Sequence, residues 1–211
     1  MTPIYFYKMT ADNFGAPHVA NNMLTLAICK PDIRRTAPKG SLIFGFAGNC
    51  MGRDNALLYA AIVEPMDGRV YYSDADFRCR GDRIYKWAGN DFQLRAQARY
   101  HSDHDERPRD VGVSPNFHNA KVLISRGNDY RYFGAHGSSK YKERCPLLTK
   151  RLTTLGQGHL NHHVPELREE LLALKACIWR DEQMIKVEPC DPPENGQSCN
   201  SCSDDEGSHQ T

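Results

Sequence analysis

Long hydrophobic runs are absent from this chain of 211 residues, and so is a basic N-terminal segment followed by an apolar one. The apolar stretch MLTLAI (residues 23–28) is followed at once by the charged segment CKPDIRR. A membrane-spanning helix needs about 20 consecutive apolar residues, and a signal peptide needs a basic region before its apolar one. We therefore expect no membrane segment, no signal peptide and a cytoplasmic location.

Paired metal-binding motifs are also missing. Of eight cysteines only Cys199 and Cys202 form a CxxC pair, and Cys190 with His209 does not supply the second pair that a zinc ribbon needs. Single cysteines such as Cys29 are typical of reduced, buried residues. Phosphate-binding loops, dinucleotide fingerprints and serine-elbow motifs are absent as well. We expect no metal and no cofactor, and the missing catalytic motifs favour binding over catalysis.

Basic side chains are scarce at the C-terminal end. From residue 181 onward Lys186 alone accompanies eight acidic residues, a net charge of −7, so residues 1–180 carry +8 of the overall +1. A basic body with an acidic tail favours a polyanionic partner such as nucleic acid, with the tail screening the body. A tail that only increases solubility is equally compatible with this composition.

Hydrophobic patterning predicts an α+β domain built on a mostly antiparallel sheet or barrel with flanking helices. Period-two and continuous apolar patterns predict strands at the following segments: YFYKM (5–9), SLIFGFAG (41–48), NALLYAAIVEP (55–65), GRVYYSD (68–74) and AKVLISRGNDYRYFG (120–134), the last as two pieces with a turn at Gly127-Asn128. Residues 77–109 are expected to form short elements within long loops.

Three helices are expected. The first covers residues 21–30 and ends before Pro31, with an asparagine as its N-cap, and the second covers residues 141–156. The third begins at Pro165 and places its leucines on one stripe with a spacing of three or four residues: Leu167, Leu171, Leu174 and Ile178. By composition, residues 188–211 form a disordered tail after a domain of residues 1–187.

Six stretches along the chain carry a resemblance to a known family and occur in the order expected for it: YFYKMTADNFGAPHV, LAICKPDIRRTAPKGSLIFGFAGN, RGDRIY, YHSDHDERPRDVG, YRYFGAHGSSKYK and LGQGH. Over residues 4–178 they resemble the second type of nucleotide modification associated domain, a family named from its occurrence near genes for modified DNA bases. The order of opening strand, basic helix, KGSLIFGF and LLYAAIVEP also resembles PUA-like and EVE-like domains. This second resemblance implies a PUA-like β-barrel that holds a modified nucleobase or nucleotide in a pocket.

Two segments of these stretches supply candidate ligand contacts near the N-terminus. TADN contains Asp12 and Asn13, which can hydrogen-bond base edges because amides offer a donor and an acceptor. CKPDIRR contains Lys30 and Arg34, which could form one wall of an anion-binding pocket, as the resemblance suggests. Cations at the end of a helix are also favoured by the helix dipole alone, so that explanation stays open.

Two further segments lie in the arginine-rich middle of the chain. RGDRIY contains Arg80, Asp82 and Tyr85, where arginine can grip phosphate and tyrosine can stack on a base, or where arginine and aspartate simply pair at the surface. HSDHDERPRD alternates histidine and aspartate, a pattern that can ligate a divalent metal, although its charge indicates a solvated loop. The resemblance points to His101 in this segment rather than to the whole cluster.

The stretch LGQGHLNHH (155–163) is expected to be an extended turn between two helices. Glycines on both sides of Gln157 allow a ligand to approach the backbone, so Gln157 and His159 are predicted to read a base edge or contact phosphate. His159 could also act as a general acid or base. His162 and His163 are expected to be exposed or to cap the following helix.

Three hypotheses for the function follow. The first is recognition of a modified nucleobase, in DNA or as a nucleotide, with Lys30 and the arginines on phosphate and with Asp12 and Gln157 on the base. The alternative is an enzyme of base or nucleotide modification, with His101 and His159 as the acid–base pair and Asp82 or Asp110 orienting one of them. The third is an interaction module whose acidic tail binds a protein of a base-modification, phage-defence or restriction system.

Overall fold

The computed structural model describes residues 2–52, 54–101, 106–134, 137–156 and 158–180. The strands are β1 (Ile4–Met9), β2 (His18–Ala20), β3 (Met23–Leu26), β4 (Ser41–Ala47), β5 (Leu57–Asp67), β6 (Tyr85–Trp87), β7 (Phe92–Leu94), β8 (Lys121–Arg126), β9 (Tyr130–Tyr132) and β10 (His159–Leu160). The main helices are α1 (Pro31–Thr36), α2 (Gly68–Ser73), α3 (Arg107–Asp110), α4 (Pro146–Thr154) and α5 (Pro165–Arg180). Among these described helices, none has the length and apolar character that crossing a bilayer requires.

One mixed sheet forms the centre of the molecule, with the strand order β10-β1-β4-β5-β8-β3-β2 and with β9 added to β5. Strands β1 and β4 are parallel, and all other neighbours in this sheet are antiparallel. The long strand β5 pairs with β4 and β9 through its first part and with β8 through residues 64–67. The mostly antiparallel α+β fold is thus confirmed. The PUA-like barrel is not, because the described strands form an open path ending at β10 and β2.

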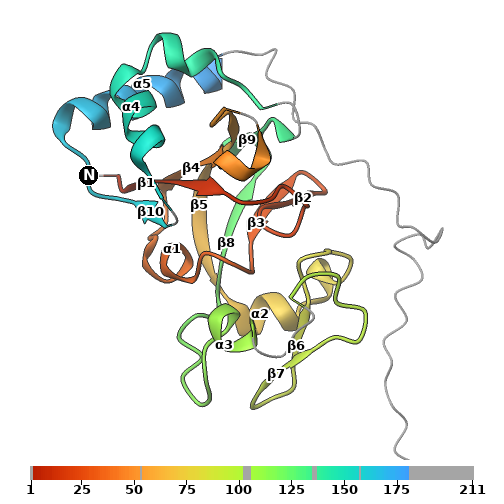
Figure 1. The fold of residues 1–211 in the computed structure, drawn as a ribbon. Helices are drawn as coiled ribbons and strands as arrows, with labels where there is room; N and C mark the ends of the chain where they lie inside the picture. Colours follow the sequence, from red (N-terminus) through yellow and green to blue (C-terminus); the bar gives the residue numbers. More distant parts are fainter. Residues whose placement is uncertain (1, 53, 102–105, 135–136, 157, 181–211) are drawn as a thin grey trace, which may run out of the picture.

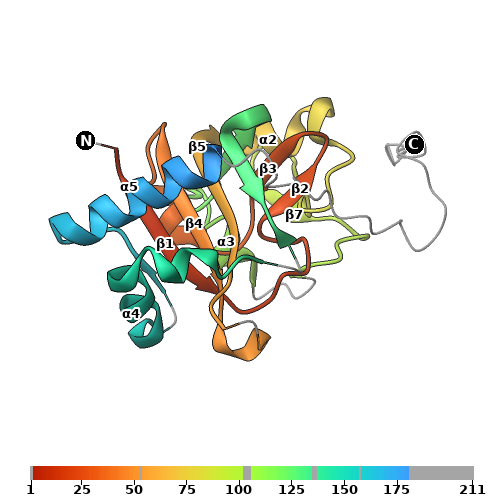
Figure 2. The ribbon, with the colours of Figure 1, turned by 90° about the horizontal axis from the view of Figure 1, so that it is seen from above.

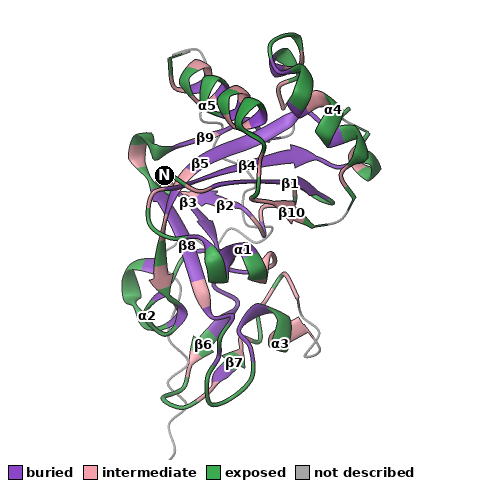
Figure 3. Ribbon diagram, turned by 90° about the vertical axis from the view of Figure 1, so that its left-hand side faces the viewer, coloured by how far each residue is buried: buried purple, intermediate pink, exposed green. Residues whose placement is uncertain are grey.

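Both faces of the sheet are covered, as Figure 3 shows by the burial of its central strands. In β1, Ile4 and Phe6 pack toward the side of α4 and α5, whereas Tyr5 and Tyr7 belong to the cluster on the opposite side. A strand that alternates between two cores must be apolar throughout, since successive side chains point to opposite faces. This requirement explains the nearly continuous apolar sequence that predicted β1, β4 and the first part of β5.

Helix α5 lies across the sheet and covers it, as seen from above in Figure 2. Its predicted stripe is confirmed, because all four members are buried against the sheet and α4: Leu167, Leu171, Leu174 and Ile178. Glu170 of α5 also caps α4, since its two carboxylate oxygens accept the backbone N–H groups of Leu147 and Leu148 at 3.1 and 2.9 Å. The helix predicted over residues 141–156 is divided into the 3-10 turn η6 (Lys140–Glu143) and α4.

The helix predicted over residues 21–30 is wrong. Residues 23–26 form β3, which pairs with β2 and β8, and the helix begins only at Pro31. Asn21 and Asn22 have φ angles of 52° and 54°, the conformation of a two-residue hairpin turn in which asparagine is favoured. They connect β2 to β3 and do not cap a helix. Pro31 then occupies the first turn of α1, where its missing N–H costs nothing.

A smaller lobe formed by α2, α3, β6 and β7 extends from one end of the sheet (Figure 1). Its core is largely aromatic and includes Tyr71, Tyr72 and Phe92. The strand predicted over residues 68–74 is wrong, because this segment forms α2. Asp67 caps the helix by accepting the N–H of Arg69 at 2.7 Å. The tyrosines point into one aromatic cluster, which a strand with its alternating faces would not allow.

Candidate active site

Three residues with unusual backbone conformations lie between the sheet and the smaller lobe. Cys29 and Lys30, in the link from β3 to α1, have φ angles of 56° and 42°, and His101 has a φ angle of 47°. Residues other than glycine rarely adopt this left-handed region, and such strain concentrates at functional sites. Six other described non-glycine residues, Asn21 and Asn22 among them, also have positive φ angles, so the side-chain contacts and not strain alone must identify a site.

The side chains of Cys29, His101 and Asp110 form one hydrogen-bonded chain. The Nδ1–H group of His101 donates to Oδ2 of Asp110 at 2.6 Å, and its Nε2 lies 3.2 Å from Sγ of Cys29. The backbone N–H of Cys29 donates to the second oxygen of Asp110 at 3.0 Å, which closes the loop of contacts. Asp110 is 1% exposed and His101 23% exposed, so solvent reaches the imidazole and not the carboxylate.

Buried groups hold this chain of contacts in place. The hydroxyl of Tyr85 donates to Oδ2 of Asp110 at 3.0 Å. Arg34, which is fully buried, donates to the backbone carbonyls of Cys29 and Asp110, both at 2.7 Å. It also donates to the carbonyls of Asn119 and Lys121 at 2.6 and 2.8 Å. One guanidinium therefore fixes the backbones of Cys29 and Asp110 relative to each other.

The hydrogen bonds also determine the charge of the imidazole. Hydrogen bonding to Asp110, and then to Cys29, raises the pKa of His101 from 6.5 to about 10, against the opposing effect of burial. His101 is therefore protonated at neutral pH. A cysteine beside an imidazole that a carboxylate orients is the arrangement of an activated nucleophile.

Two more basic groups, Lys30 and His159, lie against tyrosines of β1. The ammonium of Lys30 lies 4.5 Å from the ring centre of Tyr7, and burial lowers the pKa of Lys30. The imidazole of His159, on β10, lies 5.9 Å from the ring of Tyr5, and burial lowers its pKa as well. The charge of Lys30 acts on the pKa of His159, so the two groups share one region of the surface.

Comparison with known families gives a match over residues 1–192 to the nucleotide modification associated domain 2. The chain belongs to this family. The resemblance predicted from the sequence is thereby confirmed, and the domain is associated with nucleotide modification. No curated protein and no solved structure matched the chain.

In this nucleotide modification associated domain, three of the predicted site residues contact Cys29 or Asp110: Arg34, Tyr85 and His101. Lys30 follows Cys29 in the chain, and its ammonium lies over the ring of Tyr7. Tyr85 is fully buried, so within the described structure it donates to a carboxylate and has no open face for a base. Of the two aspartates considered as orienting groups, Asp110 contacts His101.

Arg80 and Asp82 lie in a different network, deep between the β2–β3 hairpin and α2. Asp82 is fully buried and accepts hydrogen bonds from the hydroxyls of Tyr71, at 2.6 Å, and Thr25. Arg80 donates to the carbonyls of His18 and Ala20, both at 3.0 Å, and to the hydroxyl of Thr25 at 2.8 Å. These contacts connect the smaller lobe of the domain to the sheet.

The other predicted residues are dispersed. Asp12 accepts the hydroxyl of Tyr132 at 2.7 Å, and Asn13 accepts the N–H of Gly15 at 3.2 Å in a local turn. Gln157 lies outside the described residues, as do Asp103, His104 and Asp105. Within the part of the domain that the structure describes, no group of three or more histidine, cysteine and acidic residues could hold a metal.

The predictions for the two histidines after β10 differ in outcome. His162 is exposed, as expected. His163 is only partly exposed, and its Nε2 lies 2.9 Å from the carbonyl of Ile4. Its ring stacks on Phe6 with a centroid distance of 5.3 Å, so this histidine anchors the segment after β10 to the first strand of the domain.

Cys29 is the main site residue that the sequence analysis missed. It was interpreted as an ordinary buried cysteine because it stands alone, with no second cysteine nearby. A single cysteine combined with histidine and aspartate far away in the sequence is a known pattern of nucleophilic sites. The available signal was that Cys29, His101 and Asp110 all fall within stretches that carry the family resemblance.

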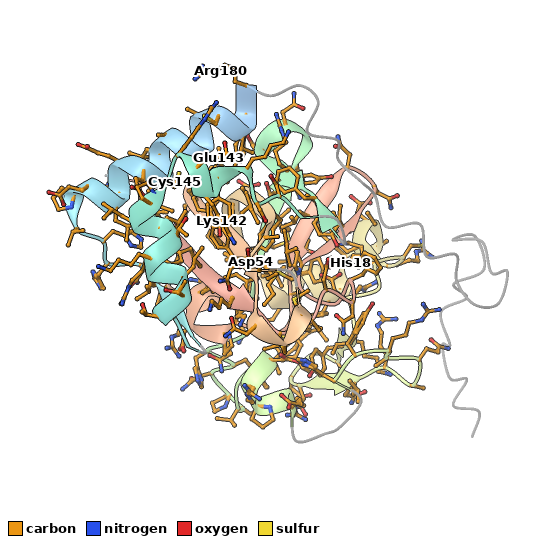
Figure 4. All side chains as sticks on the ribbon, turned by 45° about the horizontal axis from the view of Figure 1, so that its top comes forward. His18, Asp54, Lys142, Glu143, Cys145 and Arg180 are labelled. Atoms are coloured by element: carbon orange, nitrogen blue, oxygen red, sulfur yellow. The ribbon has the colours of Figure 1, made fainter. Side chains whose placement is uncertain are left out.

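Two cavities of the domain lie elsewhere. One of about 460 Å³ lies between η6 and α5 and is lined by residues that include Tyr141, Cys145 and Cys177. Figure 4 places Cys145 and Glu143 beside α5, with the paired Lys142 and Asp54 close by. The other, of about 350 Å³, lies beside α2 and includes Arg69 and Phe117. Neither contains Cys29, His101 or Asp110, so the hydrogen bonds among these three residues, and not cavity size, identify the candidate active site.

Proposed function

We propose that this domain is an enzyme of nucleotide modification in which Cys29 is the nucleophile, His101 the acid–base group and Asp110 the residue that orients His101. The chain of hydrogen bonds among these three side chains carries the proposal. An imidazolium beside a cysteine favours the thiolate form that attacks, and a buried carboxylate stabilises that imidazolium. The association of the family with nucleotide modification supports a nucleotide, or a base in DNA, as the substrate.

The step proposed for Cys29 is addition to an electrophilic carbon of a C=O or C=N group. A bond forms between Sγ and this carbon, the π electrons move to the oxygen or nitrogen, and that atom takes up the proton that His101 delivers. Collapse of the adduct re-forms the C=O or C=N bond and breaks the bond to the leaving group, which departs with the proton, so His101 is now neutral. Water then adds to the thioester or its nitrogen analogue, His101 takes a proton from that water, and cleavage of the S–C bond restores the thiolate.

In this proposal Arg34 has a positioning role. Its guanidinium donates hydrogen bonds to four backbone carbonyls, so it is not available to hold a substrate phosphate. Instead it keeps the strained backbone of Cys29 at a fixed distance from Asp110. His159, which has a lowered pKa, is the second acid–base group of the site, as the sequence analysis suggested.

Recognition of a modified nucleobase without chemistry is the second candidate. The side chains of Asp12 and His159 favour it, because both are partly exposed and both can hydrogen-bond a base edge. The two functions differ in what Cys29 does. In a base-binding protein it is dispensable, and in the enzyme it is required.

Reactivity of the cysteine tests the enzyme before any substrate is known. Cys29 is partly exposed and Cys50 is exposed, so accessibility alone would make Cys50 react faster with iodoacetamide. We expect the opposite order at pH 7, with Cys29 alkylated faster and with His101→Ala reducing its rate to that of Cys50 or below. Peptide mass spectrometry of one alkylation time course gives both rates. Slower reaction of Cys29 than of Cys50 would overturn the proposal.

Turnover tests the substrate class. The full-length protein is incubated with nucleoside phosphates and with oligonucleotides that contain plain or modified bases, and the nucleoside masses are compared. The enzyme predicts a changed mass that Cys29→Ala abolishes and the control Cys79→Ala does not. Binding of a modified base with every mass unchanged, and with full binding by Cys29→Ala, would support the base-binding function.

A further inference from the structure

Three cations were predicted from the sequence to hold phosphate, and the described contacts separate them. Arg34 and Arg80 are buried, and their guanidinium groups donate to backbone carbonyls and to Thr25. Lys30 is different: within the described residues its ammonium forms no hydrogen bond and no ion pair, and it lies over the ring of Tyr7. Lys30 is therefore the one of these three cations whose ammonium is not already engaged by the described part of the protein.

Lys30 lies next to Cys29 in the chain and is partly buried, a position in which an ammonium without a hydrogen bond or ion pair is unusual. Its backbone follows Cys29 directly, and both residues are held in the left-handed conformation. The side chain is partly buried, and the lowered pKa of Lys30 reflects the water that it has lost. A desolvated ammonium is stabilised by an aromatic face, though less than by an anion.

The acidic side chains of this region are engaged elsewhere. Asp110 is bonded to His101 and Cys29, and Asp32 forms an ion pair with Arg35 at 2.6 Å. Asp12 accepts the hydroxyl of Tyr132. None of these contacts involves the ammonium of Lys30, so within the described residues no acidic side chain neutralises it and an anionic ligand can take that place.

We propose that Lys30 is the anion-binding group of this site and that the substrate carries a phosphate or carboxylate next to the carbon that Cys29 attacks. This inference rests on the proposed function and narrows its substrate class: phosphorylated nucleotides or DNA are substrates, and neutral nucleosides and free bases are not. A free nucleotide and a DNA strand present the same anionic chemistry, so the experiment has to separate them.

The charge selectivity of Cys29 tests Lys30 without a known substrate. Iodoacetate is anionic and iodoacetamide neutral, and both alkylate the same sulfur, so the ratio of their rates reports the local charge. We expect Lys30→Met to lower the iodoacetate-to-iodoacetamide ratio at Cys29, by about tenfold at low salt. Lys39→Met, whose side chain is 81% exposed, is the matched control and leaves the ratio unchanged. Added salt should reduce the ratio in the parent protein more than in Lys30→Met.

Tryptic digestion allows the alkylation of Cys29 to be compared between the parent protein and Lys30→Met. Trypsin does not cut before proline, so the bond between Lys30 and Pro31 stays intact and residues 9–34 form the same reporter peptide in both proteins. Unchanged circular dichroism and melting temperature show that Lys30→Met is folded. If Cys29 is unreactive toward both reagents, the proposed function fails. If Cys29 is reactive and Lys30→Met leaves the ratio unchanged, the inference fails while the proposed function stands.

Protection experiments identify the source of the anion. Cys29 is alkylated with iodoacetamide in the presence of a nucleoside, its 5′-monophosphate or a short single-stranded oligonucleotide. We expect protection by one or both of the phosphorylated compounds and not by the nucleoside, and Lys30→Met should remove it. Protection by the oligonucleotide alone indicates a DNA substrate, and protection by the monophosphate alone indicates a free nucleotide. Equal protection by the nucleoside would overturn the anion-binding role.

Discussion

His101 has two hydrogen-bond partners that both favour its charged form. Asp110 accepts from one ring nitrogen and Cys29 lies at the other, so the imidazolium is stabilised on both sides although the ring is partly buried. The same contacts that position the ring for its proposed role therefore also contribute to the stability of the fold. This coupling makes the protonation of His101 measurable without a substrate.

The pH dependence of folding is one expected consequence. The pKa of His101 rises from 6.5 to about 10 on folding, so the native state binds this proton more tightly than the unfolded state does. Its contribution to stability is complete below pH 6.5 and is lost as the pH rises toward about 10. Urea unfolding at several pH values should show a free energy of unfolding that falls over this range. His101→Gln should flatten the fall, and the exposed control His162→Gln should not.

The second residue-scale prediction concerns the carboxylate. Asp110→Asn replaces an oxygen that accepts from both His101 and Tyr85 or from Cys29, so at least one buried donor loses its partner. We expect a loss of about 1–3 kcal/mol in the free energy of unfolding. Alkylation of Cys29 at pH 7 should slow as well, because the imidazolium loses its counter-charge. Asp91→Asn, at a partly exposed residue paired with Arg107, serves as the control.

A wild-type rate of alkylation in Asp110→Asn would show that the carboxylate does not act on Cys29 through His101. A loss of stability alone would then leave Asp110 with a purely structural role. The rate and the stability are measured on the same samples, so the two roles are separated directly.

At the scale of elements, the segment from β2 to α1 positions Cys29, the proposed nucleophile. The asparagine turn at residues 21–22 starts β3, and β3 pairs with β8, whose partner residues are about a hundred positions away in the chain. Pro31 then begins α1 immediately after Lys30. The nucleophile thus lies between a strand anchored in the sheet and a helix with a fixed start. This arrangement keeps Cys29 and Lys30 in their strained conformations.

Helix α5 provides an element-scale prediction with a built-in control. Leu171 is fully buried against the sheet, whereas its neighbour Leu172 is 42% exposed. Leu171→Ala should reduce the free energy of unfolding by about 2–5 kcal/mol, through lost burial and the cavity left behind. Leu172→Ala, which has the same effect on helix propensity, should change it by less than about 0.5 kcal/mol. Equal effects in urea unfolding would contradict the packing of α5.

For the whole molecule, the division of charge between residues 1–180 and residues 181–211 is a property of the sequence alone. If the positive region around Lys30 binds a polyanion, the acidic segment competes with it in the same chain. We expect a full-length variant with the acids of residues 181–211 replaced by asparagine and glutamine to bind single-stranded DNA more tightly. The difference should shrink as salt increases.

Fluorescence anisotropy at several salt concentrations measures this effect. Replacing an equal number of exposed acids elsewhere, including Glu166, Glu169 and Asp129, gives a charge-matched control. If both variants tighten binding equally, the total charge is responsible and the tail has no screening role of its own.

The sequence by itself determined which segments are apolar and with what period, and this was sufficient for β1, β4, β5, β8 and α5. It was sufficient also for the family, because the six resembling stretches lie in order along the chain. Local pattern encodes the buried face of an element but not its partner in space. Residues 23–26 and 68–74 were therefore predicted incorrectly, since pairing with β8 and packing of the tyrosines decided their structure.

Only the tertiary structure decided the composition of the candidate site. Cys29 lies 72 residues from His101 and 81 from Asp110 in the sequence, and no local signal indicates that their side chains meet. Burial likewise decided that Arg34 and Arg80 bond to backbone carbonyls while Lys30 stays unengaged within the described residues. The physical reason is the same in each case. The residue type determines the charge or nucleophilicity of a side chain, whereas the fold determines which partner contacts that side chain.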